Sequence, residues 1–263
     1  DHKKKEDMEE DHRQAGIHYV KSAQMWAKLG DHGRAGEIYE KGAYAFDEIG
    51  LHDEAAEFYL SSAEMFVDIG DYFNASYAYQ TASNYFEQAR EYHKAARSYV
   101  RAAQLALKVK DKANSSESFK KAAKCYEKMN DWAKALDAYA TALEVDSMSN
   151  SYLKVADDYE NMALCYQRLE KPKDSLYYHS KSAQLMEKGR DYLNAAKSYN
   201  ESGQLSEEFG DMQKAMEFYR KAEKLYRREK KYSQLAETQI LLAAASRKIH
   251  DLLSASKYHL DAA

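Results

Sequence analysis

Residues 29–43 read "LGDHGRAGEIYEKGA", and this order of residue types returns about every twenty positions along the 263-residue chain. The stretch holds a Gly-Asp step at Gly30 and Asp31, two small residues at Ala35 and Gly36, and Tyr39 three places later. Counted from residue 11, complete units follow one another without a gap to residue 250, and a shorter unit covers residues 251–263. Such an internal repeat is typical of a helical solenoid.

The ends of each unit carry signals for the beginning and the end of a helix. An Asp side chain accepts hydrogen bonds from the unpaired N–H groups at a helix start, and a Gly or Asn before it ends the preceding helix in the left-handed conformation. We therefore predict one helix in each unit. Asp is the first residue of these units: Asp11, Asp31, Asp71, Asp111, Asp131, Asp191, Asp211 and Asp251.

The side-chain pattern inside a unit predicts how the helices pack. Apolar and small residues recur at spacings of three and four, which forms one stripe along a helix. Because one short helix cannot bury such a stripe alone, consecutive helices must fold back on each other and stack. The predicted fold class is all-α: a right-handed α-α superhelix, built as a solenoid of antiparallel helix hairpins with about 13 helices of the repeat. Tyr at the ninth place of most units is expected to pack in this core and not to form an aromatic ligand box.

The whole chain, residues 1–263, is predicted to be one solenoid domain with one seam. Residues 144–152 read "EVDSMSNSY", and Asp146 stands where the pattern expects an aromatic residue. The cluster of Ser147, Ser149 and Asn150 predicts a longer turn, at which the superhelix can bend near residues 146–151. The units before and after this seam are expected to be two subarrays of the same solenoid.

Composition excludes several classes of protein. A formal net charge of −4 does not favour nucleic acid, and no apolar run approaches the length of an integral membrane segment. Cys125 and Cys165 are too few for a disulfide framework and suit a reducing compartment, so we expect a cytoplasmic protein. His12, His32 and His52 lack partners at metal-ligand spacing, and no phosphate loop or nucleophile elbow is present. We expect no enzyme activity, no cofactor and no metal.

Two features of the repeat resemble known families. A small residue with Tyr three places later, as at Gly16 and Tyr19, resembles the first helix of a tetratricopeptide repeat, although two units span about forty residues here. The phrase from Tyr39 to Ala43 and the Gly-Asp turns look like the soluble NSF attachment proteins. That resemblance implies a non-enzymatic adaptor in vesicle fusion and trafficking, which holds a SNARE helical bundle along a curved face and recruits a hexameric AAA+ ATPase.

Charge is distributed unevenly along the chain. Residues 31–71 carry two basic and eleven acidic side chains, whereas residues 90–128 carry eleven basic and four acidic ones. Blocks of this size can steer a charged partner over about 8–10 Å. We predict that the second block presents a basic surface to an acidic, helical protein partner. The residues of this surface are Lys94, Arg97, Arg101, Lys120, Lys121 and Lys124.

Alternatives to this interpretation remain open. The lysines could serve only as solvated ion-pair ladders along each helix, as Lys221 would with Glu217 four residues before it. The chain could also be a general peptide-binding scaffold, with Asn74, Asn114 and Asn194 in a carboxylate clamp. Self-association is a third alternative. The last unit ends at "HLDAA" before its helix is complete, so further residues or another molecule would have to cover the preceding helix.

Overall fold

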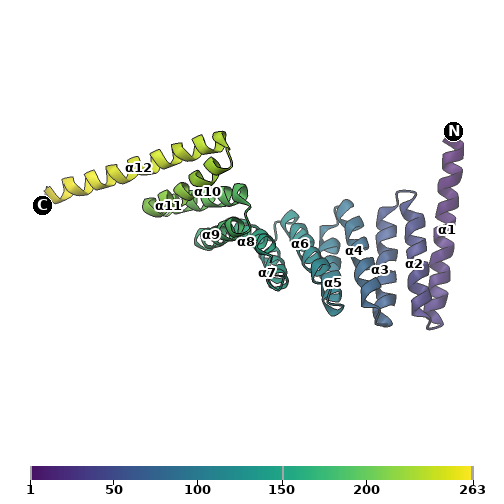
Figure 1. The fold of residues 1–263 in the computed structure, drawn as a ribbon. Coiled ribbons are helices and arrows are strands. Elements are labelled where there is room, and N and C mark those ends of the chain that lie inside the picture. Colours follow the sequence, from purple (N-terminus) through teal and green to yellow (C-terminus); the bar gives the residue numbers. More distant parts are fainter. Residues whose placement is uncertain (1, 150, 262–263) are drawn as a thin grey trace. The chain divides into compact units, whose positions relative to one another are not determined.

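The computed structural model describes residues 2–149 and 151–261, and in them it contains twelve helices (Figure 1). The helices are α1 (His2–Lys28), α2 (His32–Asp47), α3 (His52–Asp68), α4 (Tyr72–Gln88), α5 (Tyr92–Lys108), α6 (Lys112–Lys128), α7 (Trp132–Ser147), α8 (Tyr152–Arg168), α9 (Pro172–Lys188), α10 (Tyr192–Glu208), α11 (Met212–Arg228) and α12 (Tyr232–Asp261). Each helix from α2 to α11 fills one unit of the repeat, so the predicted all-α repeat architecture is confirmed.

The chain forms two compact units, Asp1–Val145 and Asp146–Ala263. In the first unit, helices α1 to α6 pack consecutively, each on the next, and α8 to α12 do the same in the second. The division falls inside the stretch 144–152. There α7 ends at Ser147 and the Ser151 hydroxyl caps α8, while Asn150 lies outside the described residues. A single solenoid that bends near residues 146–151 stays a prediction.

Most of the predicted Asp residues cap helices. In six units the Asp carboxylate accepts a hydrogen bond from the backbone N–H three residues later. These residues are Asp31, Asp71, Asp111, Asp131, Asp191 and Asp211. In three of these units the later residue is Asn, and its side chain donates to the same carboxylate, for example from Asn74 Nδ2 to Asp71 Oδ2 at 2.7 Å. Asn114 and Asn194 do likewise, so these amides belong to the caps. In these three units the polar fourth place thus serves the helix cap.

The prediction of caps at Asp11 and Asp251 is wrong, because the backbone is helical at both residues, inside α1 and α12. Neither is preceded by a Gly or an Asn that would end a helix: His250 comes directly before Asp251. The last complete unit and the shorter one after it therefore join in α12. The expected cover over the preceding helix depends on side chains of residues 251–263, which lie outside those described.

The turns share a residue in the left-handed region just before the next helix cap. Gly occupies four of these positions in the described residues, with φ between 73° and 82° at Gly30, Gly50, Gly70 and Gly210. Six residues with side chains adopt the same conformation with φ between 54° and 66°: Arg90, Lys110, Asn130, Glu170, Arg190 and Lys230. Position in the repeat therefore determines the turn even where residue type does not favour it.

Glu170→Gly is expected to stabilise the protein by about 1 kcal/mol, because glycine adopts a positive φ without the steric cost of a Cβ. Glu170 is exposed, so the substitution removes no packing. Arg220→Gly, at an exposed interior position of α11, is the control and should destabilise by about 1 kcal/mol. Thermal melts followed by circular dichroism measure both. A loss of stability in Glu170→Gly would contradict this account of the turn.

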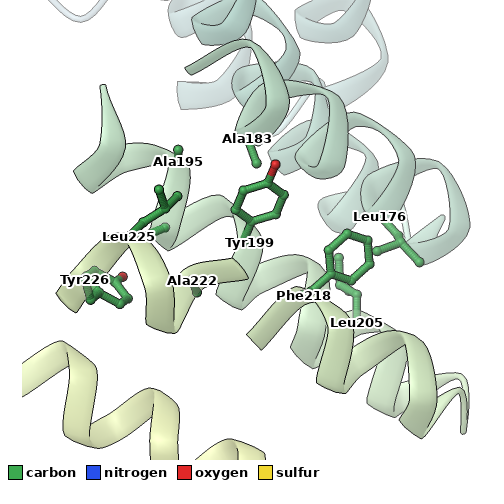
Figure 2. Packing of buried hydrophobic residues seen from close by; sticks show 10 residues of the cluster. Leu176, Ala183, Ala195, Tyr199, Leu205, Phe218, Ala222, Leu225 and Tyr226 are labelled. Carbon is green, nitrogen blue, oxygen red and sulfur yellow. The ribbon is translucent and has the colours of Figure 1, made fainter. Parts of the chain in front are cut away.

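Small residues bring neighbouring helices together, as the pair at Ala35 and Gly36 predicts. A Cβ built on Gly36 would lie 3.0 Å from the ring of Phe66, and one on Gly16 would lie 2.8 Å from the ring of Phe46. In each pair the aromatic ring comes thirty residues later, from the next helix. Figure 2 shows the corresponding core of the second unit, in which Tyr199 and Phe218 stack with ring centroids 6.2 Å apart.

Four buried tyrosines of the ninth place each donate the same kind of hydrogen bond to a glutamate. The hydroxyl of Tyr99 donates to Glu87, twelve residues before it, at 3.0 Å. The same contact recurs from Tyr139 to Glu127 (2.9 Å), Tyr199 to Glu187 (3.0 Å) and Tyr219 to Glu207 (2.9 Å). These four tyrosines are at most 2% exposed. Packing in the core is thus confirmed for them, and each hydroxyl reaches the end of the preceding helix.

Tyr219→Phe should destabilise the protein by about 1–2 kcal/mol, because the carboxylate of Glu207, only 16% exposed, loses a donor. The loss in Tyr199→Phe should be smaller, because its acceptor Glu187 is exposed and water can replace the hydroxyl. Tyr232→Phe, at a residue that is 69% exposed, serves as the control and should change nothing. Urea denaturation measures the three variants. Equal losses in all three would show that the hydroxyl contacts do not stabilise the core.

Candidate partner-binding surface

The predicted cations of α5 lie together in one hollow. Lys94, Arg97 and Arg101 are spaced by three and four residues, which places them on one face of the helix. They line a cavity of about 470 Å³ whose other side carries Glu57 and Glu64 of α3. The hollow is therefore bipolar, with a basic wall from α5 and an acidic wall from α3.

Lys94 joins the two walls. Its ammonium group lies 2.8 Å from Glu57 Oε1 and 2.8 Å from Glu91 Oε2, and 5.0 Å from the ring centroid of Phe86. The hydrogen bond that Lys94 donates to Glu57, followed by the one that it donates to Glu91, raises the pKa of Lys94 above its ordinary value. About half of each partner's surface is exposed, so water screens these pairs and they add little stability. Lys94 thus stays charged and is held between Glu57 and Glu91 in the lining of the hollow.

The other three predicted residues lie on α6, which packs against α5. The ammonium group of Lys121 lies 5.6 Å from the ring centroid of Tyr99, while Lys120 is half-buried and Lys124 is exposed. The bipolar hollow does not include them. The structure therefore places the six residues on two neighbouring helices and gathers three of them in one hollow. Sequence spacing alone did not show that an acidic wall faces these three.

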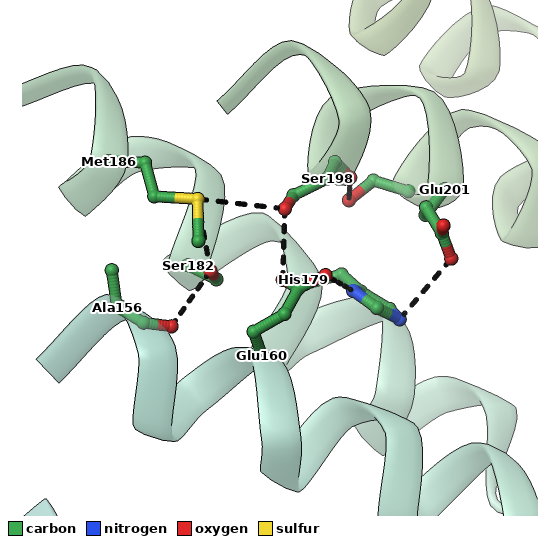
Figure 3. Close-up of polar contacts among 8 residues, drawn as sticks. Ala156, Glu160, His179, Ser182, Met186, Ser198 and Glu201 are labelled. Carbon is green, nitrogen blue, oxygen red and sulfur yellow. Dashed lines mark hydrogen bonds and ion pairs between the residues drawn. The ribbon is translucent and has the colours of Figure 1, made fainter. Parts of the chain in front are cut away.

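A second polar site lies in the other unit and was not predicted from the sequence. His179 replaces the ninth-place tyrosine on α9 and is fully buried. Its Nδ1 lies 3.3 Å from Glu160 Oε1 and its Nε2 lies 3.8 Å from Glu201 Oε2, while the Ser198 hydroxyl donates to Glu160 at 2.9 Å (Figure 3). These contacts link α8, α9 and α10. A polar residue in an aromatic column was the only signal available in the sequence.

Glu160 couples the stability of this unit to pH. Burial raises the pKa of Glu160, but the contact with His179 and its charge, together with the hydroxyls of Ser198 and Ser182, outweigh burial and leave the pKa below its ordinary value of 4.5. A carboxylate with a lowered folded-state pKa stabilises the protein above its unfolded pKa. That contribution is lost as the pH falls through the folded value.

Glu160→Gln is therefore expected to be less stable than the parent protein at pH 6, and the difference should shrink as the pH is lowered from about 5 to 3. Urea denaturation across this range gives the difference in unfolding free energy. Glu208→Gln, at an exposed residue of α10, is the control and should show a small difference with little pH dependence. A constant difference for Glu160→Gln would contradict the coupling.

The two cysteines are buried, and two of the histidines lie beside aspartates. Burial raises the pKa of the Cys125 thiol to about 12, so it carries almost no thiolate at neutral pH, and Cys165 is also buried. Nδ1 of His32 lies 2.8 Å from Asp68 Oδ2, and Nδ1 of His52 lies 3.1 Å from Asp47 Oδ1. The described residues contain no group of three metal-ligating side chains. No described helix is both long and apolar enough to cross a membrane.

The family model of the soluble NSF attachment proteins matches residues 3–113 and 108–263. This chain belongs to that family. The resemblance seen in the repeat is thus confirmed, and the family together with the fold makes the chain a helical-repeat scaffold for protein–protein interaction. No curated protein matches the chain in sequence.

Solved structures of helical-repeat proteins are similar to the chain in fold. BtubC (BKLC) from P. vanneervenii has 16% identity and a TM-score of 0.53, and the match covers 84% of this chain and 92% of that one. A signal transduction ATPase with a tetratricopeptide repeat sensor from Pyrococcus horikoshii has 17% identity and a TM-score of 0.58, over 92% of this chain and 41% of its own. A putative kinesin light chain from Podospora anserina has 11% identity and a TM-score of 0.51, over 73% and 95%. At these identities the likeness concerns the fold alone.

Proposed function

We propose that this protein is a non-enzymatic, cytoplasmic adaptor that binds an acidic helical bundle of the SNARE type through the basic block of α5 and α6 and presents it to an AAA+ ATPase. The observation that supports the proposal is the concentration of positive charge in residues 90–128, which carry eleven basic and four acidic side chains. These residues form α5, α6 and the turns that precede them, and the two helices pack on each other. Membership of the soluble NSF attachment protein family supports the class of partner.

The geometry supports a binding role for the block. Arg97 and Arg101 offer planar groups that can bind a carboxylate with two hydrogen bonds, and Lys94 is already oriented by Glu57 and Glu91. A helical partner that carries carboxylates at intervals of one turn can meet α5 at the same spacing. Several such contacts at the rim of an interface act mainly on the association rate and on its salt dependence.

Reversal of six charges tests the proposal. The variant K94E/R97E/R101E/K120E/K121E/K124E is expected to bind a purified SNARE bundle at least about tenfold more weakly at low salt, because attraction becomes repulsion. Added salt should lower the affinity of the parent protein, and this fall in affinity should be lost in the variant. Surface plasmon resonance at several salt concentrations measures both quantities.

The control variant reverses six exposed lysines of the second unit and produces the same change in net charge. Its residues are Lys173, Lys188, Lys197, Lys214, Lys224 and Lys230. This variant should keep most of the affinity if the block of α5 and α6 is the binding surface. Equal affinity in the parent protein and the α5/α6 variant would refute the proposal, as would equal losses in the two variants.

A further inference from the structure

One hollow of the first unit is lined by aromatic rings and has no role in the adaptor proposal. Its cavity volume is about 700 Å³, which is within the usual range of ligand sites. We call it the tyrosine cleft. It is defined by Tyr19 of α1, Tyr44 of α2, Tyr59 of α3 and Tyr77 of α4, with Glu37 and Glu40 of α2. Its lining also includes Lys41 of α2 and His12 of α1. Four helices therefore contribute to one site.

The tyrosines of the cleft differ from those of the core. Tyr19 is 41% exposed, Tyr44 is 58% exposed and Tyr77 is 63% exposed, whereas the four core tyrosines that bond to glutamates are at most 2% exposed. Tyr59 is half-buried and stacks on Tyr85, with ring centroids 5.7 Å apart. The exposed surfaces of these rings are available for contact with another molecule.

Two glutamates, Glu37 and Glu40, outnumber the one lysine of the cleft lining, Lys41. Glu37 and Glu40 lie one turn apart on α2, and burial, followed by repulsion from Glu37, raises the pKa of Glu40 above its ordinary value. A cation bound between them would relieve that repulsion. The part of the cleft that comes from α2 and α3 belongs to residues 31–71, which carry eleven acidic and two basic side chains. Its surroundings therefore attract positive charge.

Contacts between a guanidinium group and an aromatic ring also occur within this chain. The guanidinium carbon of Arg228 lies 3.7 Å from the ring centroid of Tyr192, and that of Arg34 lies 4.7 Å from the ring centroid of Trp26. A guanidinium group stacks on an aromatic face and can bind a carboxylate at its edge in the same pose. The tyrosine cleft places both kinds of partner around one cavity.

We infer that the tyrosine cleft binds arginine or lysine side chains of a basic segment of a partner protein. Tyr44 and Tyr77 stack on the cation, and Glu37 and Glu40 bind its N–H groups. This site takes the opposite charge from the basic block and uses different helices. The protein would thus hold two segments of opposite charge, and either site can fail without the other.

The probe for this site is a fluorescein-labelled peptide of ten residues in which arginine alternates with serine. Fluorescence anisotropy at about 0.15 M salt, where long-range attraction is screened, measures its affinity for the full chain. The matched peptide with glutamate in place of arginine should not bind at the cleft. Absence of binding by the arginine peptide to the parent protein would overturn the inference.

Two variants test the two kinds of contact. E37Q/E40Q keeps the shape of the cleft and removes its charge, and Y44L/Y77L keeps apolar area and removes the π faces. Each is expected to weaken binding of the arginine peptide by about tenfold, as loss of a main contact does at an interface. Circular dichroism should show unchanged helicity, since Tyr44 and Tyr77 are exposed.

Control variants separate the cleft from its surroundings. D53N/E54Q removes two exposed charges of the same acidic block outside the cleft, and Y152L/Y232L removes two exposed tyrosines elsewhere. Both should change the affinity for the arginine peptide less than about twofold. Equal losses of affinity in E37Q/E40Q and D53N/E54Q would show that the negative charge of the whole acidic block attracts the peptide. That result would overturn the inference. Because E37Q/E40Q should still bind an acidic SNARE bundle, failure of this site is distinguishable from failure of the adaptor proposal.

Discussion

One constraint governs this structure: a helix of sixteen or seventeen residues with one apolar stripe is stable only when neighbouring helices cover that stripe. The repeat meets this constraint in the same way many times. A small residue such as Gly36 lets the next helix approach closely enough to place the ring of Phe66 against it. A buried ninth-place tyrosine such as Tyr219 then fills the core, and its hydroxyl donates a hydrogen bond to a glutamate of the preceding helix, here Glu207. Each helix is therefore held by its neighbours on both sides.

Much of the fold could be predicted because local signals repeat. Asp31 and Gly30 are read correctly from residue type alone, since capping and a positive φ depend on a few adjacent residues. Arg90 shows the limit, because only its place in the repeat indicates a left-handed turn. Asp251 shows the opposite error: a good capping residue lies inside α12 because no turn precedes it. Local residue type is therefore reliable only where the neighbouring residue agrees with it.

The candidate surface could be predicted only in part. The charged residues can be counted in the sequence, but which acidic residue lies beside which basic one depends on how the helices pack. Counting charges finds the basic block that contains Arg97. It does not show that Glu57, thirty-seven residues before Lys94, faces that block across a hollow. The tyrosine cleft was missed for the same reason. Tyr44 and Tyr77 occupy different places of the repeat, and they line one cavity only because their helices stack.

The mutual dependence of neighbouring helices is tested most directly by hydrogen exchange in the full chain carrying Tyr199→Ala. Tyr199 is buried in α10 and packs on Phe218 of α11. Loss of its ring should lower amide protection in α9, α10 and α11 together, while residues 2–145 keep the protection of the parent protein. Loss of protection confined to α10 would contradict the account, because it would show that each helix is stable without the packing of its neighbours.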